Sequence, residues 1–317
     1  MVRLIFALLF VLNFLPGVAQ TGPVLDINFP DPTVMKFNGV YYAYATNGNG
    51  KNIQVAVSKN LKEWKILEDA LPIKPSWGNE DFWAPHVIYD AGINKYVLFY
   101  SAETVDTASG KALGVAYAER PEGPFTDKGA PLKTGRAFEE IDPFAYVDAA
   151  SGKKYLIWGS GFEPLRIQEM NNDWSDFENG SAPKSLLYPN GEKQYTRLLE
   201  GSWIDYHKGF YYLYYSGDNC CGAKANYAVL VARSKNIDGP YQTMGEANKT
   251  NRSVILEKDE NRIAPGHNSI VKDNKGKKWI VYHAIKKTAF DKGMRESRAM
   301  YINKIKYRKG WPQVIKN

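Results

Sequence analysis

One structural unit recurs five times along this chain of 317 residues. Each copy begins with a short strand-like run, passes through a Gly or Asn turn, and returns as an aromatic-rich alternating run, which is typical of a β-hairpin. The copies are FPDPTVMKFNGVYYAYAT from Phe29, WAPHVIYDAGINKYVLFYS from Trp83, IDPFAYVDAASGKKYLIWGS from Ile141, LEGSWIDYHKGFYYLYYSG from Leu199 and GHNSIVKDNKGKKWIVYHA from Gly266. Because no unit of this kind can bury both of its faces alone, the copies must pack against one another.

A third strand-like run follows each hairpin. The five runs are IQVAVSKNL, LGVAYAERP, PLRIQEMNN, AVLVARSKN and SRAMYINKI. Four of them are followed by a polar turn and an aromatic residue, and the fifth leads to Tyr307; the four aromatic residues are Trp64, Phe125, Trp174 and Tyr241. Trp64 and Trp174 lie far from the start of their units, so we expect them to pack within the fold.

Five such units predict an all-β fold, a five-bladed β-propeller. A β-sandwich is the competing all-β fold, but it would need no recurrence at this period. Aromatic residues make up 14% of the chain, with 21 Tyr and 8 Trp, and such residues favour strands. No linker rich in Pro, Gly or Ser interrupts the pattern, so we expect residues 21–317 to form a single domain.

The first twenty residues have a different character. Arg3 is followed by an apolar stretch from Leu4 to Leu15, then by Pro16, Gly17 and small residues. This pattern predicts a secretory signal peptide over residues 1–20, cleaved near Ala19 or Gln20. The stretch is shorter than the roughly 20 residues that a membrane-spanning helix needs. We therefore expect an exported protein, periplasmic or extracellular, without membrane insertion.

Charge and cysteine content exclude several other classes of protein. The net charge is +7, but the lysines are scattered along the chain instead of forming one run, so we expect a basic surface and no nucleic-acid partner. Two cysteines cannot form a disulfide scaffold, and no CxxC or HExxH spacing indicates a zinc site. We expect a monomer.

The inner strand of each propeller blade lines a central channel, so the lead positions of the five units should meet there. These positions are Asp31, Trp83, Asp142, Glu200 and His267. Three carboxylates in one pocket repel one another and destabilise a fold unless a function or a cation justifies them. Two carboxyl groups that face each other across a glycosidic bond can hydrolyse it, one as proton donor and one as activator of water. A third would raise the pKa of the donor, although spacing alone assigns no roles.

Five short segments carry a resemblance to a known family. They are NFPDPTV, DFWAPHVIYD, EIDPFAYVD, LLEGSWI and APGHNSIV, in order and at blade spacing. Together they resemble glycoside hydrolase family 43, whose members are five-bladed propellers acting on arabinose- and xylose-containing polysaccharides. The similarity extends from Asn28 to about Trp311. It implies that Asp31 is the general base, that Glu200 is the general acid, and that Asp142 tunes and orients the acid.

The resemblance also implies inversion at the anomeric carbon, with the Asp31 and Glu200 carboxyls roughly 6.5 to 9.5 Å apart. It places His267 at the channel floor, near a structural calcium ion that it would contact through water, because calcium prefers oxygen ligands. It makes Trp83 a substrate-binding aromatic of the pocket wall and implies a sugar-contacting guanidinium from Arg295 or Arg298. No cofactor is required. A purely structural role remains the alternative for His267 and Trp83, and a surface location for either arginine.

These observations predict an exported glycoside hydrolase that cleaves α-L-arabinofuranosyl linkages in plant-type polysaccharides or oligosaccharides by single displacement. A β-xylosidase, an endo-arabinanase and a galactofuranosidase are the rivals on the same scaffold. Modest loop lengths and the lack of an appended carbohydrate-binding module favour an exo-acting enzyme. A non-catalytic carbohydrate-binding propeller is the alternative of another class, and retention of all three carboxylates counts against it.

Cys220 and Cys221 are adjacent in the loop that follows the Glu200 hairpin. In an exported protein they could form a vicinal disulfide, a strained arrangement usually retained only in a functional loop; two reduced thiols are the alternative. That this loop reaches the pocket mouth and influences substrate choice is a hypothesis.

Overall fold

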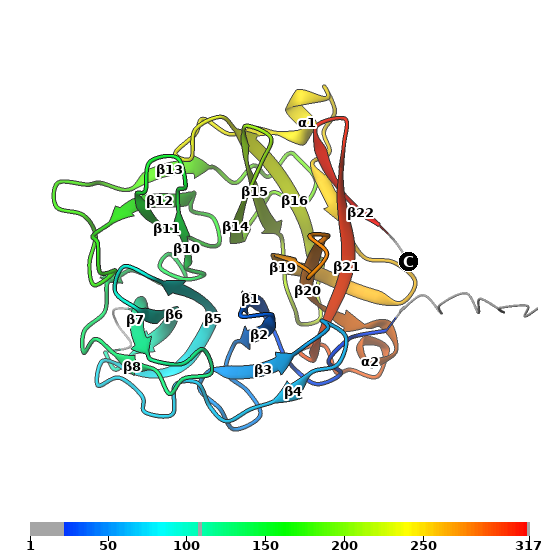
Figure 1. Ribbon diagram of the computed structural model, residues 1–317. Helices are drawn as coiled ribbons and strands as arrows, with labels where there is room; N and C mark the ends of the chain where they lie inside the picture. Colours follow the sequence, from blue (N-terminus) through cyan, green and yellow to red (C-terminus); the bar gives the residue numbers. More distant parts are fainter. Residues whose placement is uncertain (1–21, 107–109, 316–317) are drawn as a thin grey trace, which may run out of the picture.

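The computed structural model describes residues 22–106 and 110–315 (Figure 1). Five antiparallel sheets surround a central axis, so the prediction of a five-bladed β-propeller is confirmed. The predicted signal peptide, residues 1–20, lies outside the described residues. Within the described part of the chain, no helix combines the length and the apolar character needed to cross a membrane.

Each blade follows the chain outward from its inner strand. Blade 1 contains β1 (Thr33–Phe37), β2 (Val40–Ala45), β3 (Gln54–Ser58) and β4 (Lys65–Ile66). Blade 2 contains β5 (Gly78–Asp90), β6 (Lys95–Thr104), β7 (Lys111–Ala118) and β8 (Thr126–Asp127), with β9 (Lys133–Thr134) also paired to β7. Blade 3 contains β10 (Phe144–Val147), β11 (Lys154–Trp158), β12 (Leu165–Met170) and β13 (Lys184–Leu187).

Blades 4 and 5 follow the same order. Blade 4 contains β14 (Leu199–His207), β15 (Phe210–Gly217), β16 (Ala228–Ser234) and β17 (Gln242–Thr243), with β18 (Val254–Leu256) also paired to β16. Blade 5 contains β19 (Arg262–Lys272), β20 (Lys278–Lys286), β21 (Arg298–Arg308) and β22 (Trp311–Ile315). Two short helices lie in connections, α1 (Met244–Ala247) and α2 (Lys287–Asp291). Each predicted hairpin and third strand therefore forms the first three strands of one blade.

Turn chemistry sets the register of the hairpins. In blade 1, Phe37 pairs with Val40 across the turn residues Asn38 and Gly39, whose φ angles are 47° and 79°. Two successive positive φ angles are typical of the turn that matches the twist of a two-residue hairpin, and Asn-Gly is its preferred sequence. This register turns alternate residues of β1 and β2 toward the neighbouring blades.

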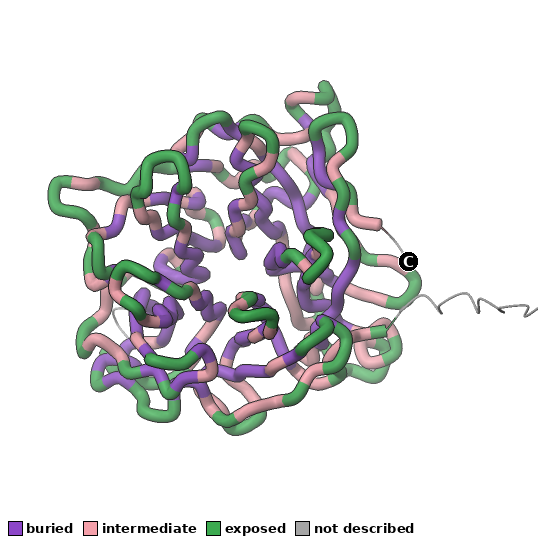
Figure 2. Tube along the Cα trace, in the orientation of Figure 1, coloured by how far each residue is buried: buried purple, intermediate pink, exposed green. Residues whose placement is uncertain are grey.

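The hydrophobic core is divided into five clusters, one between each pair of neighbouring blades. Between blades 2 and 3, for example, the fully buried Trp158 and Trp174 share a cluster with Phe99. Trp64 packs, partly buried, against the cluster between blades 5 and 1. Buried residues follow the strands, and most exposed residues lie in the turns that join them (Figure 2). Each blade is thus stabilised by the apolar faces of its two neighbours.

The segment before β1 joins the last blade to the first. The Val24 backbone N–H donates to Met300 O at 2.8 Å, Met300 N–H donates to Leu25 O at 3.1 Å, and Phe29 N–H donates to Arg298 O at 2.8 Å. These bonds attach residues 24–29 to β21 in blade 5. Because Asp31 follows almost directly, the same bonds bring it beside Arg298.

Candidate active site

One residue at the channel end of each inner strand has a positive φ angle. The five are Asp31 (56°), Ala84 (47°), Asp142 (62°), Gly201 (61°) and His267 (49°). This conformation is uncommon for residues other than glycine and persists where the surrounding structure imposes it. The structure therefore corrects the predicted lead positions: Trp83 and Glu200 lie one residue before the equivalents of Asp31. The register shifts in β5, β14 and β19 at these positions, so Ala84, Gly201 and His267 all lie in β-bulges.

The five inner turns surround a cavity of 830 Å³. Asp31, Asp142 and Glu200 all line it, together with His267 and Trp83. The structure thus brings together three carboxyl groups that are separated by 58 to 169 positions in the chain, as the propeller prediction requires. Their surroundings differ, and these differences decide what each group can do.

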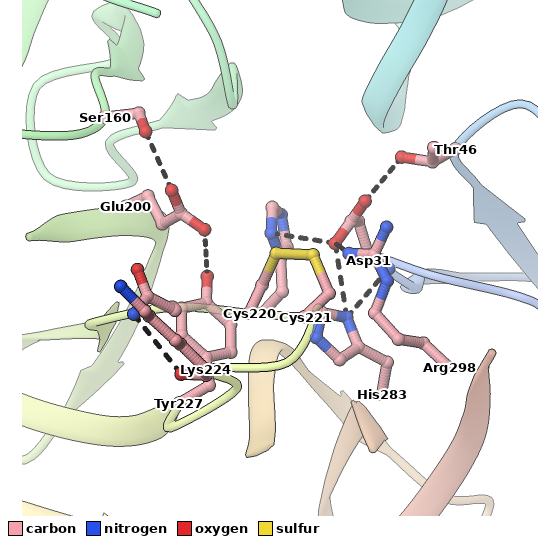
Figure 3. Close-up of a disulfide and its surroundings, with 12 residues drawn as sticks. Asp31, Thr46, Ser160, Glu200, Cys220, Cys221, Lys224, Tyr227, His283 and Arg298 are labelled. Atoms are coloured by element: carbon pink, nitrogen blue, oxygen red, sulfur yellow. Dashed lines mark hydrogen bonds and ion pairs between the residues drawn. A yellow bond between two sulfur atoms is a disulfide. The ribbon is translucent and has the colours of Figure 1, made fainter. Parts of the chain in front are cut away.

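Asp31 is buried and paired with a cation. Arg298 Nη1 donates to its Oδ1 at 3.0 Å, and Thr46 Oγ1 donates to its Oδ2 at 2.6 Å (Figure 3). Thr46 Oγ1 also accepts the Ala84 N–H at 2.8 Å, which directs its own proton toward Asp31. Burial alone would raise the pKa of Asp31, but the guanidinium of Arg298, with His267 and His283, holds that pKa well below its usual range. Asp31 is therefore an anion at neutral pH.

Asp142 has the opposite environment. Its Oδ2 accepts the Gly201 backbone N–H at 3.0 Å, which fixes the backbone directly after Glu200. Within the described part of the chain, no Lys or Arg lies within ion-pair distance of Asp142. Burial, and then the negative charges of Glu200 and Asp31, raise the pKa of Asp142 well above its usual range. This end of the cavity therefore retains a proton at a pH at which an exposed carboxyl group has lost it.

Glu200 accepts hydrogen bonds from hydroxyl groups that lie just outside two different strands, Ser160 after β11 and Tyr227 before β16. Tyr227 donates to its Oε1 at 2.7 Å and Ser160 donates to its Oε2 at 2.7 Å (Figure 3). Burial, followed by the charges of Glu200 and Asp142, raises the pKa of Tyr227 well above its usual range, so its hydroxyl stays protonated. Glu200 is half-buried whereas Asp142 is buried. Of these two carboxyl groups, Glu200 is thus the better placed to reach a ligand in the cavity.

Two histidines separate the carboxyl groups without adding charge. His283 Nδ1 accepts the Asp31 backbone N–H at 3.1 Å, and burial lowers the pKa of His283 to about 4. His267 Nδ1 lies 3.4 Å from Asp31 Oδ1 and 3.8 Å from Asp142 Oδ2. Burial also lowers the pKa of His267, although Asp31 and Glu200 oppose the effect. With both rings neutral, Arg298 is the cation that pairs with Asp31.

The remaining predicted residues divide into two groups. Trp83 lines the cavity and stacks on Phe138, with ring centroids 6.1 Å apart. Arg298 also lines the cavity through its bond to Asp31. Arg295 does not: its guanidinium lies 5.3 Å from the centroid of the Phe290 ring, and Arg295 is exposed. Of the two predicted arginines, the structure brings only Arg298 to the site.

Sequence reasoning missed one polar residue in each blade, in the last part of the second strand or just after it. These are Thr46, Ser101, Ser160, Ser216 and His283. Each contacts an inner turn: besides the bonds above, Ser101 Oγ donates to Trp83 O at 3.3 Å, and Ser216 Oγ accepts the His267 N–H at 2.8 Å. A polar residue near the end of each aromatic-rich run was the available signal. Tyr227 had no such signal, because it comes directly before a third strand.

A ring of five blades around a carboxyl-lined cavity, with an anion at one side and a retained proton at the other, is the arrangement that acid–base hydrolysis of a glycosidic bond requires. The model of the family Glycosyl hydrolases family 43 matches residues 20–312. The chain belongs to this family, which confirms the resemblance that its segments carry.

Named relatives match this chain over most of its length and most of their own. The chain is 27% identical to a probable arabinan endo-1,5-α-L-arabinosidase B of Aspergillus flavus, covering 94% of this chain and 92% of that protein. It is also 27% identical to the extracellular endo-α-(1→5)-L-arabinanase 1 of Bacillus subtilis, covering 89% and 86% respectively. The crystal structure of a thermostable family-43 glycoside hydrolase superposes with a TM-score of 0.77 at 26% identity, covering 95% of each chain.

The calcium ion that the resemblance implies stays a prediction. Among residues 22–106 and 110–315, no group of three or more His, Cys, Asp and Glu side chains is placed to hold a metal ion. Two neighbours of the inner turns fit a hydrated ion by their chemistry: the side-chain oxygens of Asn268, which follows His267, and of Ser202, which follows Gly201, are buried without a partner among these residues, and calcium accepts water and amide oxygens as ligands. An ion held by Asn268, Ser202 and His267 through water would add positive charge to the channel.

Proposed function

We propose that this family 43 glycoside hydrolase cleaves α-1,5-linked L-arabinofuranosyl bonds within arabinan chains, by single displacement with inversion. The observation that carries the proposal is the contrast between the cation-paired Asp31 and the proton-retaining environment of Asp142 beside Glu200. Inverting hydrolysis needs one ionised and one protonated carboxyl group on opposite sides of the bond. Both relatives described above are named for action on 1,5-linked arabinan, which favours the endo-arabinanase alternative over removal of single terminal residues.

In this mechanism Glu200 donates its proton to the oxygen of the departing sugar as the bond to the anomeric carbon breaks. Asp31 accepts a proton from a water molecule while the water oxygen bonds to that carbon from the opposite side. Asp142 contributes in two ways: it fixes the backbone at Gly201, and its raised pKa keeps a proton at this end of the cavity, because two neighbouring carboxyl groups do not readily ionise together. After product release, solvent returns a proton to Glu200 and removes one from Asp31.

The size of the cavity supports an oligosaccharide or polysaccharide as substrate. Its 830 Å³ lies toward the upper end of the roughly 300–1,000 Å³ of small-molecule sites, which leaves room for more than one pentose. Phe138 and Phe162, which are 52% and 71% exposed, also line it. Exposed aromatic rings next to catalytic carboxyl groups are suited to stack on the apolar faces of sugar rings.

A substrate panel tests this assignment. We expect linear arabinan to be hydrolysed, with arabino-oligosaccharides as the early products, and we expect little activity on xylan, nitrophenyl β-xyloside or nitrophenyl galactofuranoside. Chromatography of products at low conversion measures this. Arabinose as the first and dominant product would indicate exo action, and preferential cleavage of the xyloside would replace arabinan as the substrate.

Asp142→Asn separates the tuning role from a structural one. The variant removes one of two neighbouring carboxyl groups whose mutual repulsion keeps a proton at this end of the cavity, so we expect the alkaline limb of kcat/KM to move about one pH unit lower. The amide oxygen of Asn can still accept the Gly201 N–H, so the backbone contact is kept. An unchanged alkaline limb would contradict the tuning role.

The same variant has a consequence for stability. Because the pKa of Asp142 is raised in the folded protein, the carboxyl contributes full stability below the ordinary Asp pKa, and this contribution is lost as the pH rises through the raised value. We therefore expect Asp142→Asn to raise Tm relative to the wild type more at pH 8 than at pH 5, as measured by calorimetry. A relative change in the opposite direction would show that the carboxyl is not held protonated.

We also infer that the protein is exported. The N-terminal pattern of residues 1–20 supports export, as does the word extracellular in the name of the Bacillus subtilis relative. Activity in the culture medium or periplasm, together with a mature N-terminus near Gln20, would bear out this inference.

A further inference from the structure

The loop that joins β15 to β16, residues 218–227, carries a disulfide at the catalytic cavity. Cys220 and Cys221 are bonded to each other, and both line the cavity that holds Asp31 and Glu200. In Figure 3 the two sulfur atoms project between the side chains of Glu200 and Asp31. The sequence left open whether these cysteines are bonded or reduced; the structure has them bonded.

The loop is held at both of its ends and near its tip. The Asn226 N–H donates to Asn219 O at 2.9 Å, which closes the base of the loop. The Gly222 N–H, directly after the disulfide, donates to Arg295 O of blade 5 at 3.1 Å. The sulfur atoms thus have a fixed place relative to blades 4 and 5.

The two sides of the cavity wall differ in chemistry. The benzene and indole rings among the described lining residues come from blades 2 and 3 and their connection, namely Trp83, Phe138 and Phe162. The facing side, from blades 4 and 5, carries charged groups, namely Glu200, Asp218, Lys224, Glu296 and Arg298. Apart from the disulfide, the apolar side chains on this side of the cavity are those of Ala223 and Leu198.

A sugar ring has hydroxyl groups around its edge and apolar C–H groups on its faces. A ring bound between two walls therefore needs an apolar surface on each wall, because a charged side chain that is covered by C–H groups loses hydration without replacing it. A disulfide is compact, polarisable and without a hydrogen-bond donor, whereas each thiol of the reduced form is a weak donor that can rotate independently.

We propose that the Cys220–Cys221 disulfide is a substrate-binding surface on which one arabinofuranosyl ring rests, opposite the aromatic rings of blades 2 and 3. This proposal rests on the proposed function and extends it, because it assigns a specificity-determining contact to a group that takes no part in proton transfer. Reduction of the bond therefore weakens substrate binding.

The loop also continues into Tyr227, which donates to Glu200, and this offers a different route by which the disulfide could act. A disulfide that acted only by holding Tyr227 would change the proton donor and hence kcat. A disulfide that contacts the sugar changes KM and the affinity for an unreacted ligand. The two roles are therefore separable by kinetics and by binding to an inactive enzyme.

The test compares the wild type with the double variant Cys220→Ser/Cys221→Ser, which keeps side-chain size and removes the bond. On linear arabinan we expect KM to rise about fivefold, with kcat within about twofold of the wild type. Dithiothreitol should raise the KM of the wild type by the same factor, reversibly, and leave the double variant unchanged. Calorimetric titration of arabinohexaose into Glu200→Gln, with and without the two serines, should give the same factor in Kd.

Ala225→Ser is the matched control, because it alters the same loop at a residue that does not line the cavity; its KM should equal that of the wild type. Equal Tm values for the variants exclude misfolding. An unchanged KM and Kd in the double variant, or a fall in kcat alone, would overturn the proposal while leaving the arabinanase assignment intact. A wild type without activity on arabinan would instead overturn the proposed function and this inference with it.

Discussion

Glu200→Gln should lower kcat on linear arabinan about a thousandfold. Glutamine keeps the size of the side chain, and its single amide oxygen can still accept one of the two hydroxyl protons that Tyr227 and Ser160 donate to Glu200, but it has no acidic proton for the departing sugar. A dinitrophenyl arabinofuranoside releases a stable anion that needs no protonation. We therefore expect its rate to fall less than about tenfold in the same variant, as measured by release of dinitrophenolate.

The control for this prediction is Ser160→Ala, which removes one hydroxyl contact to Glu200 and leaves the acid in place. Its kcat on arabinan should stay within about tenfold of the wild type. A Glu200→Gln enzyme that hydrolysed arabinan as fast as its parent would remove Glu200 from the mechanism. That result would restore the alternative of a carbohydrate-binding propeller whose carboxyl groups have no catalytic role.

Asp31→Asn should lower the rate about a thousandfold on linear arabinan and on the dinitrophenyl arabinofuranoside alike. Attack by water needs a base whatever the departing group is, so an activated leaving group gives no relief. The contrast between the two variants in the same pair of assays therefore assigns acid and base separately. A dinitrophenyl substrate cleaved at the wild-type rate by Asp31→Asn would contradict the role of base.

The backbone allows this substitution. Asp31 has a φ angle of 56°, a conformation that Asn adopts more readily than most residues. The amide oxygen can take the place of the carboxylate oxygen that accepts from Arg298 or Thr46. Circular dichroism and Tm measured beside activity should show a folded variant, so that loss of the rate reports on chemistry.

Most of the fold could be predicted because it repeats. The period-2 pattern and the turn at Asn38 and Gly39 indicate one hairpin, and four further copies at similar spacing indicate a closed ring. The recurrence could not show how the ring closes. That depends on bonds from Val24 and Phe29 to β21, which are backbone contacts and leave no pattern in side-chain polarity.

The sequence predicted those site residues that stand at the same position in each repeated unit, at the channel. Asp31, Asp142 and His267 occupy equivalent positive-φ positions, whereas in the other two blades that position belongs to Ala84 and Gly201, one residue after Trp83 and Glu200. Contacts that cross between blades were not predictable, as with Tyr227 at Glu200 and Arg298 at Asp31. Which arginine reaches the cavity depends on where β21 begins. The strand starts at Arg298, which lines the cavity, whereas Arg295 lies in the preceding loop beside Phe290.

The division of labour between the carboxyl groups is tested most directly by the configuration of the first product. Proton NMR of an arabino-oligosaccharide digest, recorded within minutes of adding enzyme and before mutarotation, shows which anomer of the new reducing end forms. Water activated by Asp31, opposite to a proton from Glu200, gives the β-anomer from an α-linkage. Initial formation of the α-anomer would require a covalent glycosyl-enzyme and would contradict the roles given to both residues.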